Sequence, residues 1–111
     1  MSNILISAER NFIQIKEHIS YSSDGVVSKV IWKNDFSQKS LFCLAATTEI
    51  SEHTSTRDAT LQVIEGTGVL TLNDKNIALE TGIFIFMPAN APHALKADSN
   101  LAFILTLSAV T

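Results

Sequence analysis

The chain is predicted to fold as one all-β domain of the sandwich or barrel class. Three features indicate this: short apolar runs recur along the sequence, turn-forming residues separate them, and no segment carries a long helical stripe. The runs are about five residues long and begin roughly every 8 to 12 residues, a spacing typical of sandwiches and barrels. The length of 111 residues fits a single domain with one core.

Eight strands are predicted, each from a run enriched in β-branched, aromatic or aliphatic residues. They span residues 26–33, 40–48, 59–64, 69–72, 76–79, 83–87, 93–97 and 101–107. The pair Asn34-Asp35 ends the first strand, and the second apolar run follows it. Glu65-Gly66 and Asn73-Asp74 close the third and fourth strands, because they contain residue types that favour turns.

Turn-forming or strand-breaking residues also end the later strands. The short fifth strand stops before Gly82, and Pro88 ends the sixth because proline cannot donate to a strand ladder. Residues 98–100, with the turn-forming sequence Asp-Ser-Asn, separate the last two strands. Before residue 26 the signal is weaker: residues 12–15 are a strand candidate, and residues 8–19 lack the apolar stripe of a helix.

The composition excludes several classes of protein. The net charge is −3 and the lysines are scattered, so a nucleic-acid partner is not expected. No stretch approaches the roughly 20 apolar residues that a membrane helix requires, and the first residues lack the pattern of a secretory signal. The single cysteine excludes an intrachain disulfide. We therefore expect a cytoplasmic protein without membrane contact.

The distribution of apolar residues predicts an assembly. The hydrophobic fraction is 46% and the charged fraction only 17%. Residues 83–86 and 101–107 are apolar on both faces of their strands, and such strands are covered on both sides. An isolated small barrel covers only the inner faces, so we expect a homodimer formed through one sheet.

Two histidines are the strongest candidates for chemistry. His53 is expected in the loop that enters the third predicted strand, and His93 follows a turn bracketed by Pro88 and Pro92. Each stands where a strand meets a turn, and in a closed barrel such positions can point into one mouth. Imidazole is a common metal ligand.

The surroundings of His53 resemble the first motif of the cupin family, G-x5-H-x-H-x3-4-E-x6-G. His53 stands at the first histidine of the motif and Gly66 at its closing glycine. The second histidine position holds Ser55, and the glutamate position, counted back from Gly66, holds Ala59. Two of the metal-binding positions of this motif therefore lack a strong ligand.

The surroundings of His93 resemble the second cupin motif, P-x-G-x2-H-x3-N preceded by G-x5. Gly82 is followed by five residues and then Pro88. Asn90 and His93 stand at the glycine and the histidine of the motif, and Ala97 replaces its asparagine. The spacing from Gly82 to His93 matches the family position by position.

The chain thus resembles a small single-domain cupin of the RmlC-like type. The resemblance implies an antiparallel double-stranded β-helix, the cupin jelly-roll barrel, as one domain over residues 1–111, with the barrel at about residues 26–108. Cupins usually hold a metal ion with three histidines and one glutamate, and only His53 and His93 remain here. Cys43, on a neighbouring strand, is a further candidate ligand because a thiolate binds soft metals strongly.

Two functional hypotheses follow from the resemblance. In the first, His53 and His93 hold a divalent ion such as Zn, Ni, Mn or Fe, and the protein acts on a small molecule in a dioxygenase- or isomerase-like reaction. In the alternative, the protein is a non-catalytic module with a degenerate metal site, and its barrel binds a small ligand. The sequence is equally consistent with no cofactor, and it leaves open whether the protein is an enzyme.

The alternative hypothesis predicts an apolar lining for the barrel. Leu61, Val63 and either Phe84 or Phe86 are expected to contribute to it. Arg57 is expected on a solvated rim, with attraction of an anionic substrate as the other interpretation.

Overall fold

The computed structural model describes residues 4–109, which form nine strands and one short 3₁₀ helix. The elements are η1 (Ile15–His18), β1 (Val26–Lys33), β2 (Ser37–Leu44), β3 (Glu49–His53), β4 (Asp58–Glu65), β5 (Gly68–Leu72), β6 (Lys75–Leu79), β7 (Phe84–Met87), β8 (His93–Ala97) and β9 (Leu101–Ser108). No helix in this part of the chain is long and apolar enough to cross a membrane.

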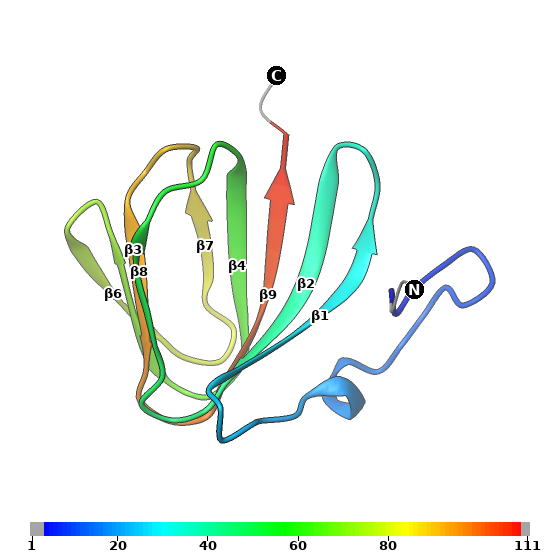
Figure 1. The fold of residues 1–111 in the computed structure, drawn as a ribbon, viewed down its shortest axis with the longest axis horizontal. Coiled ribbons are helices and arrows are strands. Elements are labelled where there is room, and N and C mark those ends of the chain that lie inside the picture. The colour runs from blue at the N-terminus through cyan, green and yellow to red at the C-terminus, as the bar shows by residue number, and fades with distance from the viewer. Residues whose placement is uncertain (1–3, 110–111) are drawn as a thin grey trace.

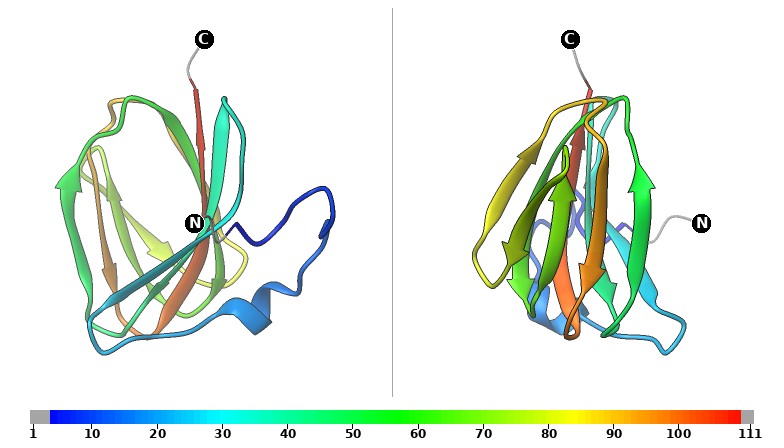
Figure 2. Two further views of the ribbon diagram at one scale, coloured as in Figure 1. Left: turned by 45° about the vertical axis from the view of Figure 1, so that its right-hand side comes forward. Right: turned by 90° about the vertical axis from the view of Figure 1, so that its left-hand side faces the viewer.

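The strands form two sheets that face each other (Figure 1). One sheet has five strands in the order β1-β2-β9-β4-β7, and the other has four in the order β3-β8-β5-β6. Neighbouring strands pair antiparallel throughout both sheets. The two sheets stand as opposite walls of the barrel (Figure 2). This arrangement confirms the predicted all-β jelly-roll fold.

The core fills the space between the sheets and is most completely shielded where β2 ends and β9 begins. Leu44 and Leu101 are opposite each other in the β2–β9 ladder, and both are fully buried. The turn after β4 closes this end, because Gly66 adopts a φ of +94° and lies directly against the backbone of Asn100. A Cβ at Gly66 would overlap that backbone, so the position requires glycine. We call this region the packed end.

An N-terminal strap, residues 4–21, covers part of the outer face of the five-stranded sheet (Figure 1). The Leu5 and Ile6 amides donate to the carbonyls of Val30 and Ile31 on β1, at 3.1 and 2.9 Å. Apolar side chains of the strap pack on an outer-face cluster whose buried members are Ile31, Leu41, Cys43 and Ala102. The strap and the outer face of the sheet therefore form a second, smaller core on the outside of the barrel.

A polar contact also fixes the end of the strap to the sheet. The Tyr21 hydroxyl donates to Glu65 Oε2 on β4 at 2.7 Å. Burial, and then the hydrogen bond and charge of Glu65, raise the pKa of Tyr21 well above its ordinary value. Nearby, the Lys29 ammonium on β1 donates to the carbonyl of His18 at 2.7 Å.

Three predicted segments need correction. β2 ends at Leu44, not at residue 48, because the chain turns there and Thr47 adopts a positive φ of 73°. β3 was expected as a loop but forms an edge strand of the four-stranded sheet. Its single apolar residue, Ile50, leaves no run for a sequence pattern to detect. The weak strand candidate at residues 12–15 forms no strand, and η1 begins at Ile15.

Candidate functional site

The two histidines come together across a pair of strands. β3 and β8 lie side by side, and His53 is opposite His93 in their register. The centroids of the two imidazole rings are 4.2 Å apart, with 63° between the ring planes. His53 is exposed and His93 is half-buried. His53 thus lies at the end of a strand and not in the loop where the sequence placed it.

Hydrogen bonds fix the orientation of both rings in the same way. His53 Nδ1 lies 2.9 Å from the Ser51 carbonyl oxygen, and His93 Nδ1 lies 2.9 Å from the Ala91 carbonyl oxygen. A carbonyl oxygen only accepts, so we assign the proton of each neutral ring to Nδ1. Both Nε2 atoms then have a free lone pair that can accept a proton or a hydrogen bond, or bind a metal.

The turn before His93 is held by the loop that follows His53. The Asn90 amide donates to the Ser55 carbonyl at 2.7 Å, and the Ala89 amide donates to Asp58 Oδ1 at 2.9 Å. Asn90 adopts a φ of 70°, the left-handed conformation that asparagine tolerates better than most residues. These contacts connect the loops on either side of the histidine pair.

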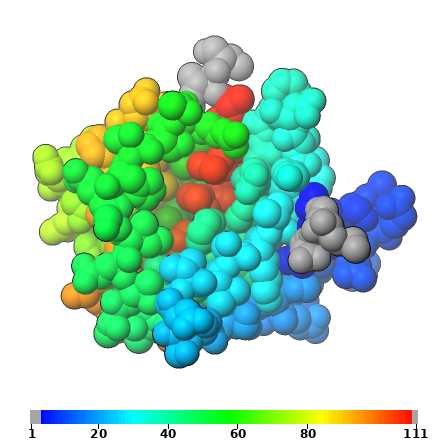
Figure 3. Space-filling view, viewed as in Figure 1, coloured from blue at the N-terminus to red at the C-terminus, as the bar shows by residue number. Residues whose placement is uncertain are grey.

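Two adjoining hollows meet at the histidines. The first, which we call the apolar chamber, has a volume of about 180 Å³ and lies inside the barrel. It is lined by Phe42, Ile50, His53, Leu61, Leu70, His93, Ala94, Leu95, Phe103 and Leu105. The rings of Phe42 and Phe103 are stacked with centroids 5.4 Å apart. Figure 3 shows the barrel hollowed between β3 and β2, with atoms of β9 at the base of the hollow.

The second hollow, the loop chamber, has a volume of about 250 Å³. It is lined by His53, Ser55, Arg57, Ala59, Met87, Pro88, His93, Leu105 and Leu107. The two chambers share both histidines and Leu105. Ser55 and Ala59, the positions where the family resemblance expects a histidine and a glutamate, therefore do face the same space as His53 and His93.

Cys43 lies away from this site. It belongs to the buried cluster under the strap, on the outer face of the five-stranded sheet. Its neighbours Phe42 and Leu44 face the barrel interior, because successive side chains of a strand point to opposite faces. Burial raises the pKa of the Cys43 thiol, which further disfavours a thiolate ligand. The expectation that Cys43 completes the site is not supported.

The predicted apolar lining is right in part. Leu61 lines the apolar chamber, whereas Val63 is buried in the core of the barrel and lines neither chamber. Phe84 and Phe86 are 62% and 55% exposed and point outward from β7. Phe42, Phe103 and Leu105 also line the apolar chamber, which the sequence pattern did not predict. Their alternation along β2 and β9 is a usable signal only once the inward face of each strand is known.

The side chains near the histidine pair show whether a metal ion of the cupin type would fit this site. The two histidines are prepared for ligation, since ligating imidazoles commonly donate their other N–H to a backbone carbonyl. However, within residues 4–109 no group of three or more His, Cys, Asp or Glu side chains is arranged to hold a metal ion. Asp58 is engaged by the Ala89 amide. Catalytic zinc sites generally have three protein ligands, and facial-triad iron sites need a carboxylate. The residues present do not fit a firmly held metal of that type.

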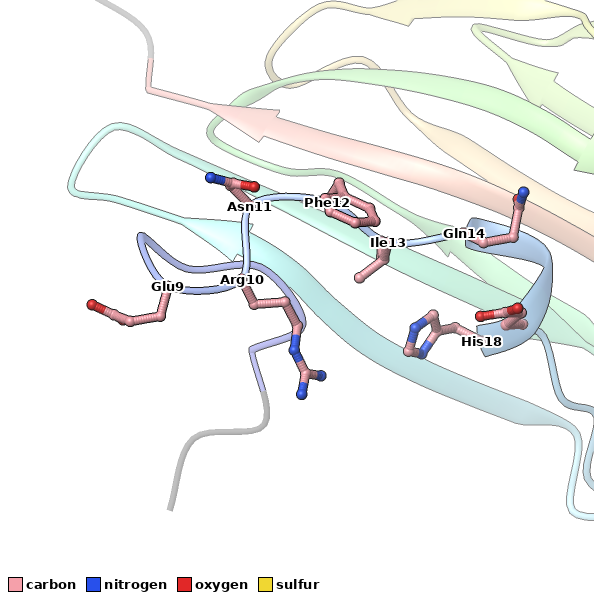
Figure 4. Close-up of a pocket in the computed structure, with 8 residues that line it drawn as sticks. Glu9, Arg10, Asn11, Phe12, Ile13, Gln14 and His18 are labelled. Carbon is pink, nitrogen blue, oxygen red and sulfur yellow. The ribbon is translucent and has the colours of Figure 1, made fainter.

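A larger groove of about 710 Å³ lies beside the strap. Figure 4 shows that it is bordered by one chain segment that includes Arg10, Phe12, Ile13 and His18. The groove is distant in sequence from both motifs and contains neither His53 nor His93. The barrel interior is therefore the better candidate site.

Comparisons with known proteins agree with this architecture. The family described as Cupin domain matches residues 40–108, more than half of the chain. No curated protein matches the chain. A conserved protein of unknown function from Streptococcus pyogenes is similar in structure, with a TM-score of 0.84 and 24% identity, covering 100% of this chain and 97% of that one.

Two further solved structures share the fold at lower identity. An RmlC-like cupin from Shewanella frigidimarina NCIMB 400 has a TM-score of 0.75 and 17% identity, covering 78% of each chain. Salicylate 1,2-dioxygenase from Pseudoaminobacter salicylatoxidans has a TM-score of 0.71 and 19% identity, covering 85% of this chain and 28% of that one. At such identities the likeness shows the fold alone, because one fold hosts many activities.

Proposed function

Because this chain belongs to the cupin family, we propose that it binds a small, mostly apolar molecule inside its barrel. The observation that carries the proposal is the apolar chamber, whose polar features are two imidazoles with free Nε2 atoms. Binding pockets typically combine an apolar lining with a few polar groups that set the orientation of the ligand. A ligand hydroxyl or N–H donating to Nε2 of His53 or His93 would supply that orientation.

The chemistry of the chamber limits the ligand. Apart from the histidines, the lining side chains are aliphatic or aromatic. A polar group of the ligand placed against them would lose its hydrogen bonds to water without compensation. The ligand therefore has its polar group at the histidine pair and a compact apolar body away from it. Without a bound metal, a neutral imidazole there can also accept a proton from the ligand.

A second candidate function is weak binding of a divalent ion. It is favoured by the matching hydrogen bonds from both Nδ1 atoms to backbone carbonyls, which present Nε2 of His53 and His93 as ligands. An ion held there by His53 and His93 would supply Lewis-acid chemistry of the kind that supports dioxygenase- or isomerase-like activity. With two protein ligands the affinity would be low, so this candidate ranks second.

Binding of benzyl alcohol tests the first candidate, because this probe combines one ring with one donor. We expect saturable amide shifts in two-dimensional NMR spectra at Leu61, Leu70 and Leu105, unchanged by EDTA. The variant Leu105→Phe fills the chamber and should abolish the shifts, whereas Ile104→Phe on the opposite face of β9 should not. Shifts that are absent, or equally lost in both variants, would contradict the proposal.

Metal content separates the two candidates. Tag-free protein is dialysed against an excess of Ni, Zn, Mn or Fe, and the metal held beyond the concentration in the dialysis buffer is measured by mass spectrometry. The first candidate predicts well under one ion per chain, because it needs no metal at the histidine pair. About one ion per chain, lost in His93→Ala, would support the second candidate and overturn its ranking.

We also propose that the protein is cytoplasmic and that it forms a homodimer. Phe84 and Phe86 project from β7, and the strap covers the same outer face at β1, β2 and β9. An exposed aromatic patch on a face that is otherwise covered by the strap is typical of an interaction surface. A second copy is the simplest occupant, because it presents the same patch across a two-fold axis.

A further inference from the structure

We infer that the ligand of this barrel is a small carboxylate whose charged end lies at Arg57 and whose apolar body fills the apolar chamber. The inference rests on the proposed function and names the class of molecule bound. Its first support is that the two chambers adjoin, since His53, His93 and Leu105 line both of them. A ligand lying across these three residues would occupy the apolar chamber at one end and the loop chamber at the other.

The size of the apolar chamber sets the size of the apolar body. Its volume is about 180 Å³. Apolar cavities of about 150 Å³ in proteins hold one benzene molecule. The stacked rings of Phe42 and Phe103 add aromatic surface to its lining. The chamber thus suits a single six-membered ring or a branched chain of similar bulk.

The charge in the loop chamber sets the polar end. Arg57 is the one permanently charged side chain among the residues that line either chamber. The carboxylate of its neighbour Asp58 is bonded to the Ala89 amide. Within residues 4–109 no carboxylate forms an ion pair with the Arg57 guanidinium. The guanidinium is therefore available to an anion, and its planar donors match a carboxylate with two parallel hydrogen bonds.

Hydrogen bonds hold the loop that carries Arg57 in place. The Arg57 amide donates to Ser55 Oγ at 3.1 Å, and the Ser55 carbonyl accepts from the Asn90 amide at 2.7 Å. The loop that carries Arg57 is thus tied to the turn before His93. Nδ1 of each histidine already lies against a backbone carbonyl, so neither Nδ1–H is available to a carboxylate. The two features together direct the negative end to Arg57.

Benzoate and benzamide test the inference, since they have nearly the same shape and differ in charge. Their affinities are measured at neutral pH by two-dimensional NMR titration of the full chain. We expect benzoate to bind about 5- to 10-fold more tightly, a modest factor because Arg57 is exposed to solvent. The preference should shrink at about 0.5 M salt, as expected for a screened ionic contact.

Variants identify the residue responsible. Arg57→Gln should remove the preference for benzoate and leave benzamide affinity within about twofold. Arg57→Lys should retain part of the preference, since it keeps the charge but loses the planar pair of donors. Arg10→Gln, on the strap, is the matched control and should change nothing.

The outcomes are separable. Equal binding of benzoate and benzamide, or a benzoate preference that survives Arg57→Gln, overturns the carboxylate inference and leaves the proposed function standing. If neither probe nor benzyl alcohol binds in the chambers, the proposed function fails and the inference fails with it.

Discussion

The inner and outer faces of the five-stranded sheet are covered by different means. The inner face packs against the four-stranded sheet, and at the histidine end that packing is incomplete, leaving the two chambers. The outer face is covered by the strap over β1, β2 and β9, but β7 carries Phe84 and Phe86 in the open. Each face thus has one part that the chain itself covers and one part that it leaves uncovered. The inner gap suits a small ligand, and the outer gap suits a second protein surface.

The largest effect is expected from contrasting the packed end with the chamber. Leu101→Ala should destabilise the fold by about 3 kcal/mol, because a fully buried leucine is replaced by a cavity. Leu105→Ala, on the same strand and face, should cost only about 1 kcal/mol, since its side chain already borders empty space. Urea denaturation measures both values. Equal losses would show that Leu105 is packed as tightly as Leu101, and therefore that the chamber is filled in solution.

The next effect concerns the uncovered part of the outer face. Phe84→Ser should weaken self-association by about 10- to 100-fold, because aromatic residues at the centre of an interface dominate its affinity. Phe36→Ser is the control: Phe36 is also strongly exposed, at 72%, but it lies in the turn between β1 and β2. Sedimentation velocity over the micromolar range measures the association. A wild-type chain that stays monomeric, or a dimer equally sensitive to Phe36→Ser, contradicts the proposed interface.

The sequence predicted the parts of this fold that depend on apolar runs and turn residues. Nearly all strands lie close to their predicted ranges, because each contains a dense β-branched or aliphatic run. The motif spacing around His53 and His93 also anticipated that the two would meet. β3 escaped detection because an exposed edge strand with one inward side chain, Ile50, gives no periodic signal.

Assignments of residues to a face were harder to predict. A strand that is apolar on both faces, such as β7, does not show which side is the core, so the prediction that either Phe84 or Phe86 faces the interior was wrong. The face of Cys43 was equally hard to predict, because a shift of one residue along the strand exchanges its two faces. The hydrogen bonds that orient the histidines depend on backbone carbonyls, which no side-chain pattern reveals.

The smallest effect tests how the strap is attached on the outer face. Tyr21→Phe removes the hydrogen bond to Glu65 and should cost about 1 kcal/mol, a value reduced by the partial exposure of the pair. Ligand binding inside the barrel should be unchanged. Urea unfolding near neutral pH and the benzyl alcohol titration measure the two quantities.

The pH dependence provides the sharper version of this test. The folded-state pKa of Tyr21 is raised above its ordinary value of 10.0, so the folded protein holds this proton more tightly than the unfolded chain. The stabilisation is therefore fully present below pH 10 and is lost as the pH rises from there toward the folded-state pKa. Because Tyr21 is the only tyrosine, the difference between the wild type and Tyr21→Phe isolates its titration from that of the lysines. We expect the advantage of the wild type to shrink above about pH 10. A difference that stays constant to higher pH would mean that the Tyr21–Glu65 contact does not persist in solution, and that apolar packing alone holds the strap.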